Sequence, residues 1–401
     1  MRIVSVNHTA DVYGASRCLE RFAARAVRDG HELLVVLPGP GALKDALDAI
    51  GVTVRLHPLL TIIDRNTTRT LRNQLALLAR FPLSVIWLMW TIAGFRADVV
   101  HTNGGVAISP AFAAKLLRRP HVWHVREFFL EFPRLWPRYE RLMFVMSDAI
   151  VAVSQAIRSQ FSERSRSKVW VVYDGLPAAE FERRAVEPET RAVRERFGLG
   201  QGVSACVVGR LKWKRKGQEV FIRAAGLLKS KYPDAVYLVV GTAAPGSEDH
   251  VDRFRALAHE VGVGDRVVFT GDIRDVRPVY AAVDVSVAPS VDPEPFGCIV
   301  IESMAMGTPV VGSAAAGIAE QIVDGQTGYL FAPGDEHGLA AALDTLFGDE
   351  QRRREIAAGA RRRFLGEFEL EESYGNYLRV FEAVRRGPTA LHASPDGAIA
   401  K

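Results

Sequence analysis

Two glutamates with seven residues between them, Glu294 and Glu302, enclose the run PFGCIVI. We predict a helix from Ile299 to Met306, because Pro295 favours a helix start and Gly307 a helix end. Eight helical residues span roughly 12 Å, which exceeds the roughly 5 to 9.5 Å between the carboxyl groups of a glycosidase. We therefore do not expect this pair to perform hydrolysis.

The residues between the two glutamates would open this helix. The first N–H groups of a helix have no partner inside it, and such groups attract anions. The segment favours an elongated ligand with hydroxyl groups at both ends and negative charge in the middle. The alternative is that two exposed glutamates flank an ordinary helix.

The length and composition indicate a globular protein of two domains. The chain has 401 residues, of which 48% are apolar and 24% charged, and it exceeds the usual size of a single core. The three cysteines, Cys18, Cys206 and Cys298, are scattered and match no metal-ligand spacing. We expect a reducing compartment and no structural metal. The opening MRIVSVNH enters a strand without the apolar core of a signal peptide, so we expect a cytoplasmic protein.

The positive charge is concentrated in the first half. Residues 1–187 carry 25 Lys and Arg against 17 Asp and Glu, an excess of +8, whereas the remaining residues carry 26 against 29. The chain has no lysine-rich arm, zinc pattern or aromatic ribonucleoprotein signature, so we do not expect a nucleic-acid partner. An anionic lipid surface or a phosphorylated acceptor fits the excess better.

Short β-branched runs alternate with helical patterns along the chain. This alternation predicts an α/β fold with parallel strands and crossover helices. The predicted strands lie near 2–6, 32–37, 52–56, 98–102, 121–125 and 149–154 in the first half, and near 204–210, 236–241, 266–271, 285–290, 308–313 and 328–331 in the second.

The apolar pattern lapses over 173–190, where Pro, Gly and charge accumulate. We predict a first domain over 1–180 and a second over 181–370. A helix over 371–386 would cross back to the first domain, and 387–401 would be a disordered tail. Ligands of open α/β sheets bind beyond the carboxyl ends of the strands, so two facing sheets would make a cleft.

Residues 82–95 form the most apolar stretch, and at about 14 residues they are shorter than the roughly 20 that cross a bilayer. A basic helical stripe precedes them. An interfacial membrane contact would use Arg65, Arg69 and Arg72 together with Trp87 and Trp90. The alternative is a core helix with a solvated basic face.

The second half resembles the donor domain of glycosyltransferase family 4. These are retaining enzymes of the GT-B architecture, also called glycosyl transferases group 1, with two facing Rossmann-like domains. Four segments carry the resemblance in the family's order: VVGRLKWKRKG, RVVFTGDIRDVRPVYAAVDVSVAPS, EPFGCIVIESMAMGTPVV and GIAEQIVDGQTGYLF. The resemblance covers roughly 200–335 strongly and the first half more loosely. It implies that the elongated ligand is a nucleotide sugar.

The resemblance also implies roles for single residues. Glu302 would accept hydrogen bonds from the ribose, Glu294 from the donor sugar, and Arg210 and Lys216 would hold the diphosphate. The neighbouring Lys212, Lys214 and Arg215 are rivals for the role of Lys216. Backbone groups of Phe296, Gly297, Cys298 and Ile299 would face the sugar and diphosphate, and the base would lie near Gly271, Ile273 and Ser290. The sequence does not separate UDP-sugar from GDP-sugar donors.

In the first half, the family's glycine-rich loop corresponds to VYGAS, which keeps Gly14 but has Tyr13 where another glycine is usual. His124 matches the family's cleft histidine, and we place it with Glu294, Arg210 and Lys216 as catalytic. His8 is the rival histidine, since inverting enzymes of related architecture use one after the first strand. Acceptor contacts would come from Asn103, Arg126 and Glu127.

The resemblance implies an internal-return reaction, in which the leaving phosphate takes the proton of the acceptor. No carboxylate nucleophile stands at the matched positions. The chain has no Asp-x-Asp motif near a strand end, and Arg210, Lys216 and the helix start would supply positive charge. We therefore expect no metal and no other cofactor.

We conclude from the sequence that the protein is a glycosyltransferase that extends a glycan or a lipid-linked acceptor, as in bacterial surface polysaccharide synthesis. It would act in the cytoplasm, and a peripheral attachment to the inner face of the cytoplasmic membrane is a further hypothesis. One alternative is a nucleotide-sugar 2-epimerase of the same architecture. Another is a catalytically silent subunit that binds nucleotide sugars. A NAD enzyme is not favoured, since no Gly-x-Gly-x-x-Gly follows the first strand.

Overall fold

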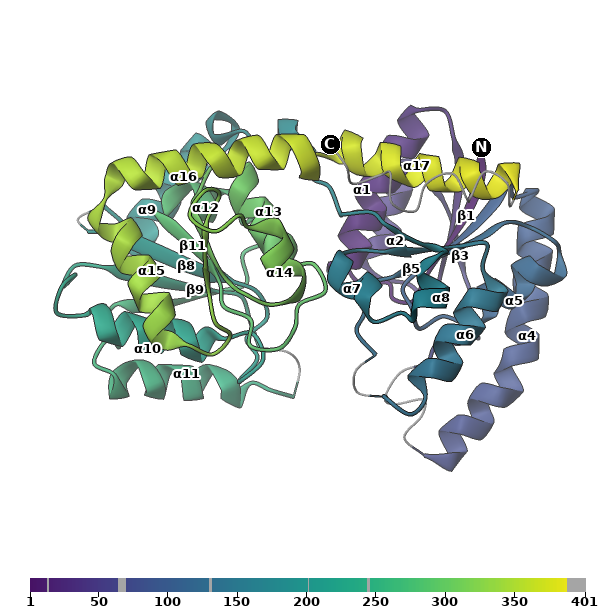
Figure 1. Ribbon diagram of the computed structural model, residues 1–401, viewed down its shortest axis with the longest axis horizontal. Helices are drawn as coiled ribbons and strands as arrows, with labels where there is room; N and C mark the ends of the chain where they lie inside the picture. Colours follow the sequence, from purple (N-terminus) through teal and green to yellow (C-terminus); the bar gives the residue numbers. More distant parts are fainter. Residues whose placement is uncertain (13, 64–69, 130–131, 201, 244–245, 388–401) are drawn as a thin grey trace. The chain divides into compact units, whose positions relative to one another are not determined.

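The computed structural model describes residues 1–401 except 13, 64–69, 130–131, 201, 244–245 and 388–401 (Figure 1). The chain divides into two compact units. The first contains residues 1–175 together with the C-terminal part from 370, and the second contains 176–369. Sequence reasoning placed the boundaries at 180/181 and 370/371. Each unit is built on one parallel sheet.

The sheet of the first unit has the strand order β3-β2-β1-β4-β5-β6-β7. All of its pairings are parallel, and the order reverses between β1 and β4, where a ligand site is expected in such sheets. The strands are β1 (Arg2–Asn7), β2 (Glu32–Leu37), β3 (Thr53–Leu56), β4 (Val99–Asn103), β5 (His121–Val125), β6 (Ala149–Ala152) and β7 (Val169–Val171).

Helices cover both faces of this sheet. α1, α2 and α17 enclose one core with the strands, and α4 and α5 enclose the other. The helices are α1 (Ala15–Arg28), α2 (Ala42–Ala49), α4 (Leu71–Phe95), α5 (Ser109–Leu116), α6 (Trp136–Met146), α7 (Gln155–Ser159), α8 (Glu163–Arg166) and α17 (Leu370–Arg386).

The last helix, α17, follows the second unit in the chain and packs into the first. Tyr374, Tyr377 and Phe381 lie 5.4–5.9 Å, centroid to centroid, from the Phe22 ring of α1. All three are buried, so the core of the first unit is completed by residues from the far end of the chain.

The sheet of the second unit has the order β10-β9-β8-β11-β12-β13, again with every pairing parallel. The strands are β8 (Ser204–Val208), β9 (Val236–Val240), β10 (Val267–Gly271), β11 (Val285–Ala288), β12 (Val310–Ser313) and β13 (Tyr329–Phe331). Because β8 and β11 are neighbours, the segments that follow them leave the sheet side by side at one edge.

The helices of the second unit include α9 (Glu187–Phe197), α10 (Gln218–Leu228), α11 (Asp249–Glu260), α12 (Arg277–Ala282), α13 (Cys298–Ala305), α14 (Ala316–Gln321), α15 (Glu336–Gly348) and α16 (Glu350–Arg363). Short 3-10 turns cover Ala178–Phe181 and Arg183–Val186, and a π-helical turn covers Phe364–Phe368. The principal core lies between the sheet and the helices α10, α11 and α15.

The predicted strands agree with the structure, and one further strand was missed. All twelve predicted runs overlap observed strands, whereas β7, which lies just before the linker segment 173–190, was not predicted. β7 has three residues and is followed by Gly and Pro, so its local pattern is too short to stand out from a loop.

The expectation about residues 82–95 was wrong in its length. They continue the preceding residues in a single helix of 25 residues, α4, which starts after Thr70 and runs through Pro82. Pro82 removes one backbone hydrogen bond, but the packed helix continues through it. α4 is long and apolar enough to cross a membrane by length and composition, and 28% of its most apolar window is buried. Arg65 and Arg69 lie outside the described residues.

Candidate active site

The second unit brings Lys216 and Glu294 together. Lys216 follows β8 and Glu294 follows β11, and the Lys216 ammonium makes an ion pair with Oε2 of Glu294. The Ser290 hydroxyl lies 3.5 Å from the same oxygen. The two charged side chains are 33% and 23% exposed, so water reaches both. Two residues predicted as catalytic therefore meet at one edge of the sheet.

Backbone contacts hold the two segments in this position. The N–H groups of Val291 and Asp292 both donate to the carbonyl of Arg215, at 3.0 and 3.2 Å. Gly217 has φ of 71°, and a Cβ atom there would lie 1.8 Å from the carbonyl oxygen of Pro289. Only glycine fits this close approach, and it places Lys216 beside Glu294.

The other basic residues of the loop have different positions. Arg210 is exposed at the start of the loop, and its carbonyl accepts a hydrogen bond of 3.0 Å from the buried Gln218 amide. Arg215 pairs with Asp292 at 3.7 Å on the surface. Lys214 is exposed. Among Lys214, Arg215 and Lys216, the geometry therefore singles out Lys216 as the partner of Glu294.

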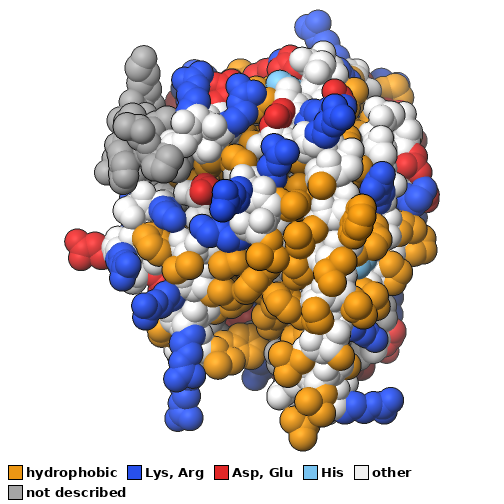
Figure 2. All heavy atoms as spheres, turned by 90° about the vertical axis from the view of Figure 1, so that its right-hand side faces the viewer, with side chains coloured by type: hydrophobic (Ala, Val, Ile, Leu, Met, Phe, Trp, Pro, Cys, Tyr) orange, Lys and Arg blue, Asp and Glu red, His pale blue; other side chains and the backbone are white. Residues whose placement is uncertain are grey.

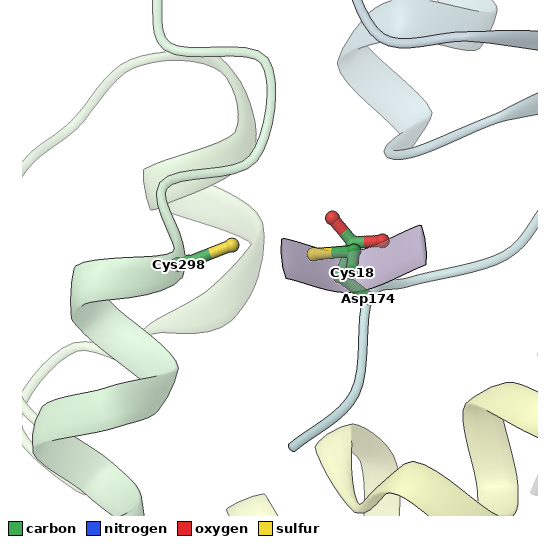
Figure 3. A group of neighbouring side chains, drawn as sticks. All are labelled: Cys18, Asp174 and Cys298. Atoms are coloured by element: carbon green, nitrogen blue, oxygen red, sulfur yellow. The ribbon is translucent and has the colours of Figure 1, made fainter. Parts of the chain in front are cut away.

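The helix start predicted between the two glutamates is present, but it has a different cap. α13 begins at Cys298, with Gly297 as its N-cap at φ of 72° and no acidic residue in its first turn (Figure 3). Pro295 lies before the helix rather than at its first position. The Pro295 carbonyl lies close to α14: a Cβ atom added to Gly317 of that helix would lie 2.3 Å from the Pro295 carbonyl oxygen. The partial positive charge of the α13 N-terminus can thus face an anion.

Glu302 lies on α13 and is buried. The hydroxyl of Tyr280 on α12 donates a hydrogen bond of 3.2 Å to its Oε2. Burial, followed by the Glu302 charge, raises the pKa of Tyr280 well above its ordinary value. The phenol therefore keeps its proton and orients the carboxylate.

Sequence reasoning missed Gln321, the last residue of α14. Its side chain is fully buried, and neither amide atom has a hydrogen-bond partner among the described residues. Its Oε1 lies 3.8 Å from the position of a Cβ on Gly297, so the amide is directed toward the N-cap of α13. Buried amides rarely lack hydrogen-bond partners, so the Gln321 amide marks a place where a ligand or a water molecule binds. The only signal in the sequence is a polar residue within the apolar motif GIAEQIV.

The residues assigned to the base are spread along the sheet edge. Gly271 ends β10 with φ of 74°, Ile273 follows it half-buried, and Ser290 is buried after β11. β10 and β11 are three strand positions apart in the sheet, or roughly 14 Å at ordinary spacing. Among the residues that the structure describes, no hydrogen bond or ion pair joins these three, so only an elongated ligand can reach all of them.

In the first unit, His124 is enclosed rather than exposed. It is the penultimate residue of β5, is fully buried, and its Nδ1 lies 3.1 Å from the hydroxyl of Tyr377 on α17. Burial, followed by the charge of Arg126, lowers the pKa of His124 well below its ordinary value. The imidazole is therefore neutral at pH 7. His8, the rival, is half-buried with Nδ1 3.2 Å from the Asn103 carbonyl.

Two of the predicted acceptor residues belong to a buried network. Arg126 binds both carboxylate oxygens of Asp174, at 2.6 and 2.8 Å. Its Nε donates to Asn103 at 2.9 Å, and Asn103 donates to Asn7 at 2.8 Å. The Asp174 carboxylate and the Cys18 thiol lie within 4.8 Å of each other (Figure 3). This network fixes the carboxyl ends of β1, β4 and β5.

The remaining predicted residues at that edge of the sheet hold the backbone of the loops in place. Glu127 accepts from the N–H groups of Gly105 and Arg126, at 2.8 and 3.0 Å. Gly14 caps α1 with φ of 41°, while Tyr13 lies outside the described residues. The predicted residues Gly14, Asn103, His124, Arg126 and Glu127 all lie at the ends of strands β1, β4 and β5 or in the loops that follow them.

Two α/β units with parallel sheets, and a helix N-terminus beside a Lys–Glu pair in the second, define the GT-B class of glycosyltransferases. Comparison with protein families agrees with this architecture. The model of Glycosyltransferase Family 4 matches residues 12–180, and that of Glycosyl transferases group 1 matches residues 194–363. The two matches together take in most of the chain, so the chain belongs to the family 4, group 1 glycosyltransferases and is an enzyme of this kind.

Three known proteins illustrate the similarity. HepE of Anabaena, solved in complex with UDP and glucose, is 25% identical with a TM-score of 0.81, over 96% of this chain and 100% of that one. The GDP-mannose-dependent alpha-(1-6)-phosphatidylinositol monomannoside mannosyltransferase of Mycolicibacterium smegmatis is 26% identical over 84% of this chain and 87% of that protein. The D-inositol 3-phosphate glycosyltransferase of Xylanimonas cellulosilytica is 36% identical over 49% of this chain and 46% of that protein.

Proposed function

We propose that this enzyme transfers a sugar from a nucleoside-diphosphate sugar to a glycan or lipid-linked acceptor, with retention of the anomeric configuration and without a metal. The reaction would serve bacterial surface polysaccharide synthesis on the cytoplasmic side of the membrane. The observation that carries the proposal is the Lys216–Glu294 pair beside the N-terminus of α13. The names of HepE and the mycobacterial relative, which mention UDP and GDP-mannose, support a nucleotide-sugar donor.

The ion pair suits a ligand that carries both hydroxyl groups and phosphate. Without donor, Lys216 and Glu294 satisfy each other. With donor, Lys216 turns to the diphosphate and Glu294 accepts hydrogen bonds from the sugar hydroxyls. Both side chains are partly exposed, so the exchange of partners costs little desolvation. Glu302, oriented by Tyr280, accepts from the ribose.

The positive groups stabilise the leaving diphosphate. As the bond between the anomeric carbon and the phosphate oxygen breaks, negative charge grows on that oxygen. Lys216, Arg210 and the N–H groups that open α13 provide fixed positive charge there. The acceptor hydroxyl then attacks the same face of the sugar, and its proton passes to the leaving phosphate. This sequence gives retention without a carboxylate nucleophile.

The proposal is tested with a panel of UDP- and GDP-sugars, with and without glycan and lipid-linked acceptors. We expect nucleoside diphosphate release that depends on acceptor, survives EDTA and yields a product with the donor's anomeric configuration by NMR. Interconversion of the sugar without transfer would indicate an epimerase. Binding of donor without any turnover or hydrolysis would indicate a silent subunit. An inverted product, or full loss of activity in EDTA, would contradict retention or metal independence respectively.

A further inference from the structure

Helix α4 presents an uncovered apolar stripe on the first unit. Its members recur every three or four positions and so line one side of the helix. The exposed fractions of its leucine, isoleucine and tryptophan members range from 53% at Ile86 to 78% at Trp90, and its proline is also exposed. The stripe consists of Leu71, Leu75, Leu78, Pro82, Ile86 and Trp90.

The opposite side of α4 is anchored in the domain core. Val85, Leu88 and Ile92 are buried against β1, β2, β4 and α5. The Ser84 hydroxyl, also buried, donates to Ser109 at 2.8 Å. Trp87 stacks on His57 with centroids 4.1 Å apart, so it faces the domain, unlike Trp90. α4 is therefore packed into the domain on one side, and its other side is apolar and exposed to solvent.

The apolar area extends beyond α4. Figure 2 shows hydrophobic side chains gathered over this face of the first unit, with Lys and Arg side chains around them. α4 packs against α5, and α5 against α6. Leu116 at the end of α5, Leu135 just before α6 and Val145 within α6 are exposed. A contiguous exposed apolar area of this kind marks an interaction site.

Within the described part of the segment 71–146, which forms this area, the exposed charges have one sign. No Asp or Glu is exposed among the described residues from 71 to 146. The exposed cations in the same range are Arg72, Arg80, Arg96, Lys115, Arg118, Arg119, Arg134, Arg138 and Arg141. Basic residues beside an apolar helix face complement an anionic lipid surface, where headgroups are negative and acyl chains apolar.

We propose that the face formed by α4, α5 and α6, here called the basic-apolar face, docks on an anionic membrane surface with α4 lying in the interface. Leu75, Ile86 and Trp90 enter the acyl boundary, and the surrounding cations meet the headgroups. The inference concerns attachment alone, so it stands apart from the chemistry proposed above.

Two other occupants fit the observations less well. A membrane-spanning α4 would have to withdraw Leu88 and Ile92, both fully buried, from the domain core. A second copy of the chain would bring two sets of exposed cations face to face, and the described residues from 71 to 146 offer no exposed carboxylate between them. A lipid surface faces neither difficulty.

The test uses the full chain and sedimentation with vesicles of phosphatidylcholine, with or without phosphatidylglycerol. We expect binding to the anionic vesicles alone, with release at high salt as the Debye length shortens. Replacing Arg72, Arg80, Arg138 and Arg141 by Gln should weaken binding at least about a hundredfold, at about fivefold for each charge. The matched control replaces exposed arginines of the second unit, Arg191, Arg194, Arg196 and Arg354, and should bind as wild type.

The apolar part is tested by the pair Ile86→Glu and Trp90→Glu, with Leu227→Glu and Leu365→Glu as controls on the second unit. We expect the first pair to lose vesicle binding at least about tenfold, since each buried apolar side chain contributes. Turnover with a soluble acceptor should stay at the wild-type level in every variant, which separates failed attachment from failed catalysis. Equal binding to both vesicle types, resistance to alkaline carbonate extraction, or a dimer by light scattering without vesicle binding would each overturn the proposal.

Discussion

The Lys216–Glu294 pair joins residues 78 positions apart, and we propose that its cation meets the leaving diphosphate. We expect Lys216→Ala and Arg210→Ala each to lower kcat at least about tenfold, as removal of a contact to transition-state charge does. Lys214→Ala, in the same loop but exposed, should leave kcat unchanged. The measurement is steady-state release of nucleoside diphosphate. Wild-type turnover in the Lys216 variant would refute its assignment.

Gln321 offers a test in which stability and ligand binding move in opposite directions. Its amide is buried without a partner among the described residues, which costs about 1–3 kcal/mol. Gln321→Met keeps the side-chain length and removes this cost. We expect the free energy of unfolding of the unliganded protein to rise by about 1–2 kcal/mol, by urea titration.

The same Gln321→Met variant should bind nucleoside-diphosphate sugar more weakly, at least about fivefold by calorimetry, since a hydrogen bond is worth about 1 kcal/mol. Gln218→Met is the comparison variant: Gln218 is also buried with its Oε1 lacking a partner among the described residues, but its amide nitrogen donates to the Arg210 carbonyl. Because that hydrogen bond is lost, this variant should be less stable than Gln321→Met. Unchanged donor affinity in the Gln321 variant would show that the amide does not meet the donor.

At the level of elements, the site depends on the turn between β8 and α10. Gly217→Ala would combine left-handed strain of about 1 kcal/mol with a clash against the Pro289 backbone. We expect the second unit to lose about 3 kcal/mol or more, and activity to fall because Lys216 is displaced. Gly334→Ala is the control, since Gly334 has φ of 82° but open space around it. Similar urea midpoints for the two variants would contradict the close approach.

Over the whole molecule, acid sensitivity should be greater in the first unit than in the second. Burial lowers the pKa of His57 to about 4 and of His101 and His121 to about 3, and that of His124 well below its ordinary value. In the unfolded chain these groups titrate near 6.5, so above that pH they do not affect stability. As the pH falls from about 6.5 toward the folded values, only the unfolded chain gains protons. Each histidine then lowers stability by up to about 1.4 kcal/mol per pH unit.

We therefore expect amides of the first unit to lose protection from hydrogen exchange, corrected for intrinsic rates, between pH 7 and pH 5. Those of the second unit should change less, because its described histidines, His250, His259 and His337, are not buried. His121→Gln should reduce the loss and His337→Gln should leave it unchanged. Equal losses in both units would rule out the histidines as the cause.

Much of this architecture could be predicted because short-range sequence patterns determine it. β-branched runs alternating with helical periods predict the strands and their parallel pairing, and the segment EPFGCIVIE predicts a helix start with Glu302 on the helix. These signals depend on neighbours within a few residues. β7 was not predicted because its three residues carry too little of that pattern.

The amino-acid sequence by itself thus determined the fold class, the family and the residues that could do chemistry. The tertiary structure alone decided which of them meet and which are enclosed. It placed Lys216 rather than Lys214 against Glu294, buried His124 beneath Tyr377 and left Gln321 without a partner among the described residues. It also continued α4 through Pro82 and left one side of this helix exposed. These outcomes depend on contacts between segments far apart in the chain, for which a single sequence has no local signal.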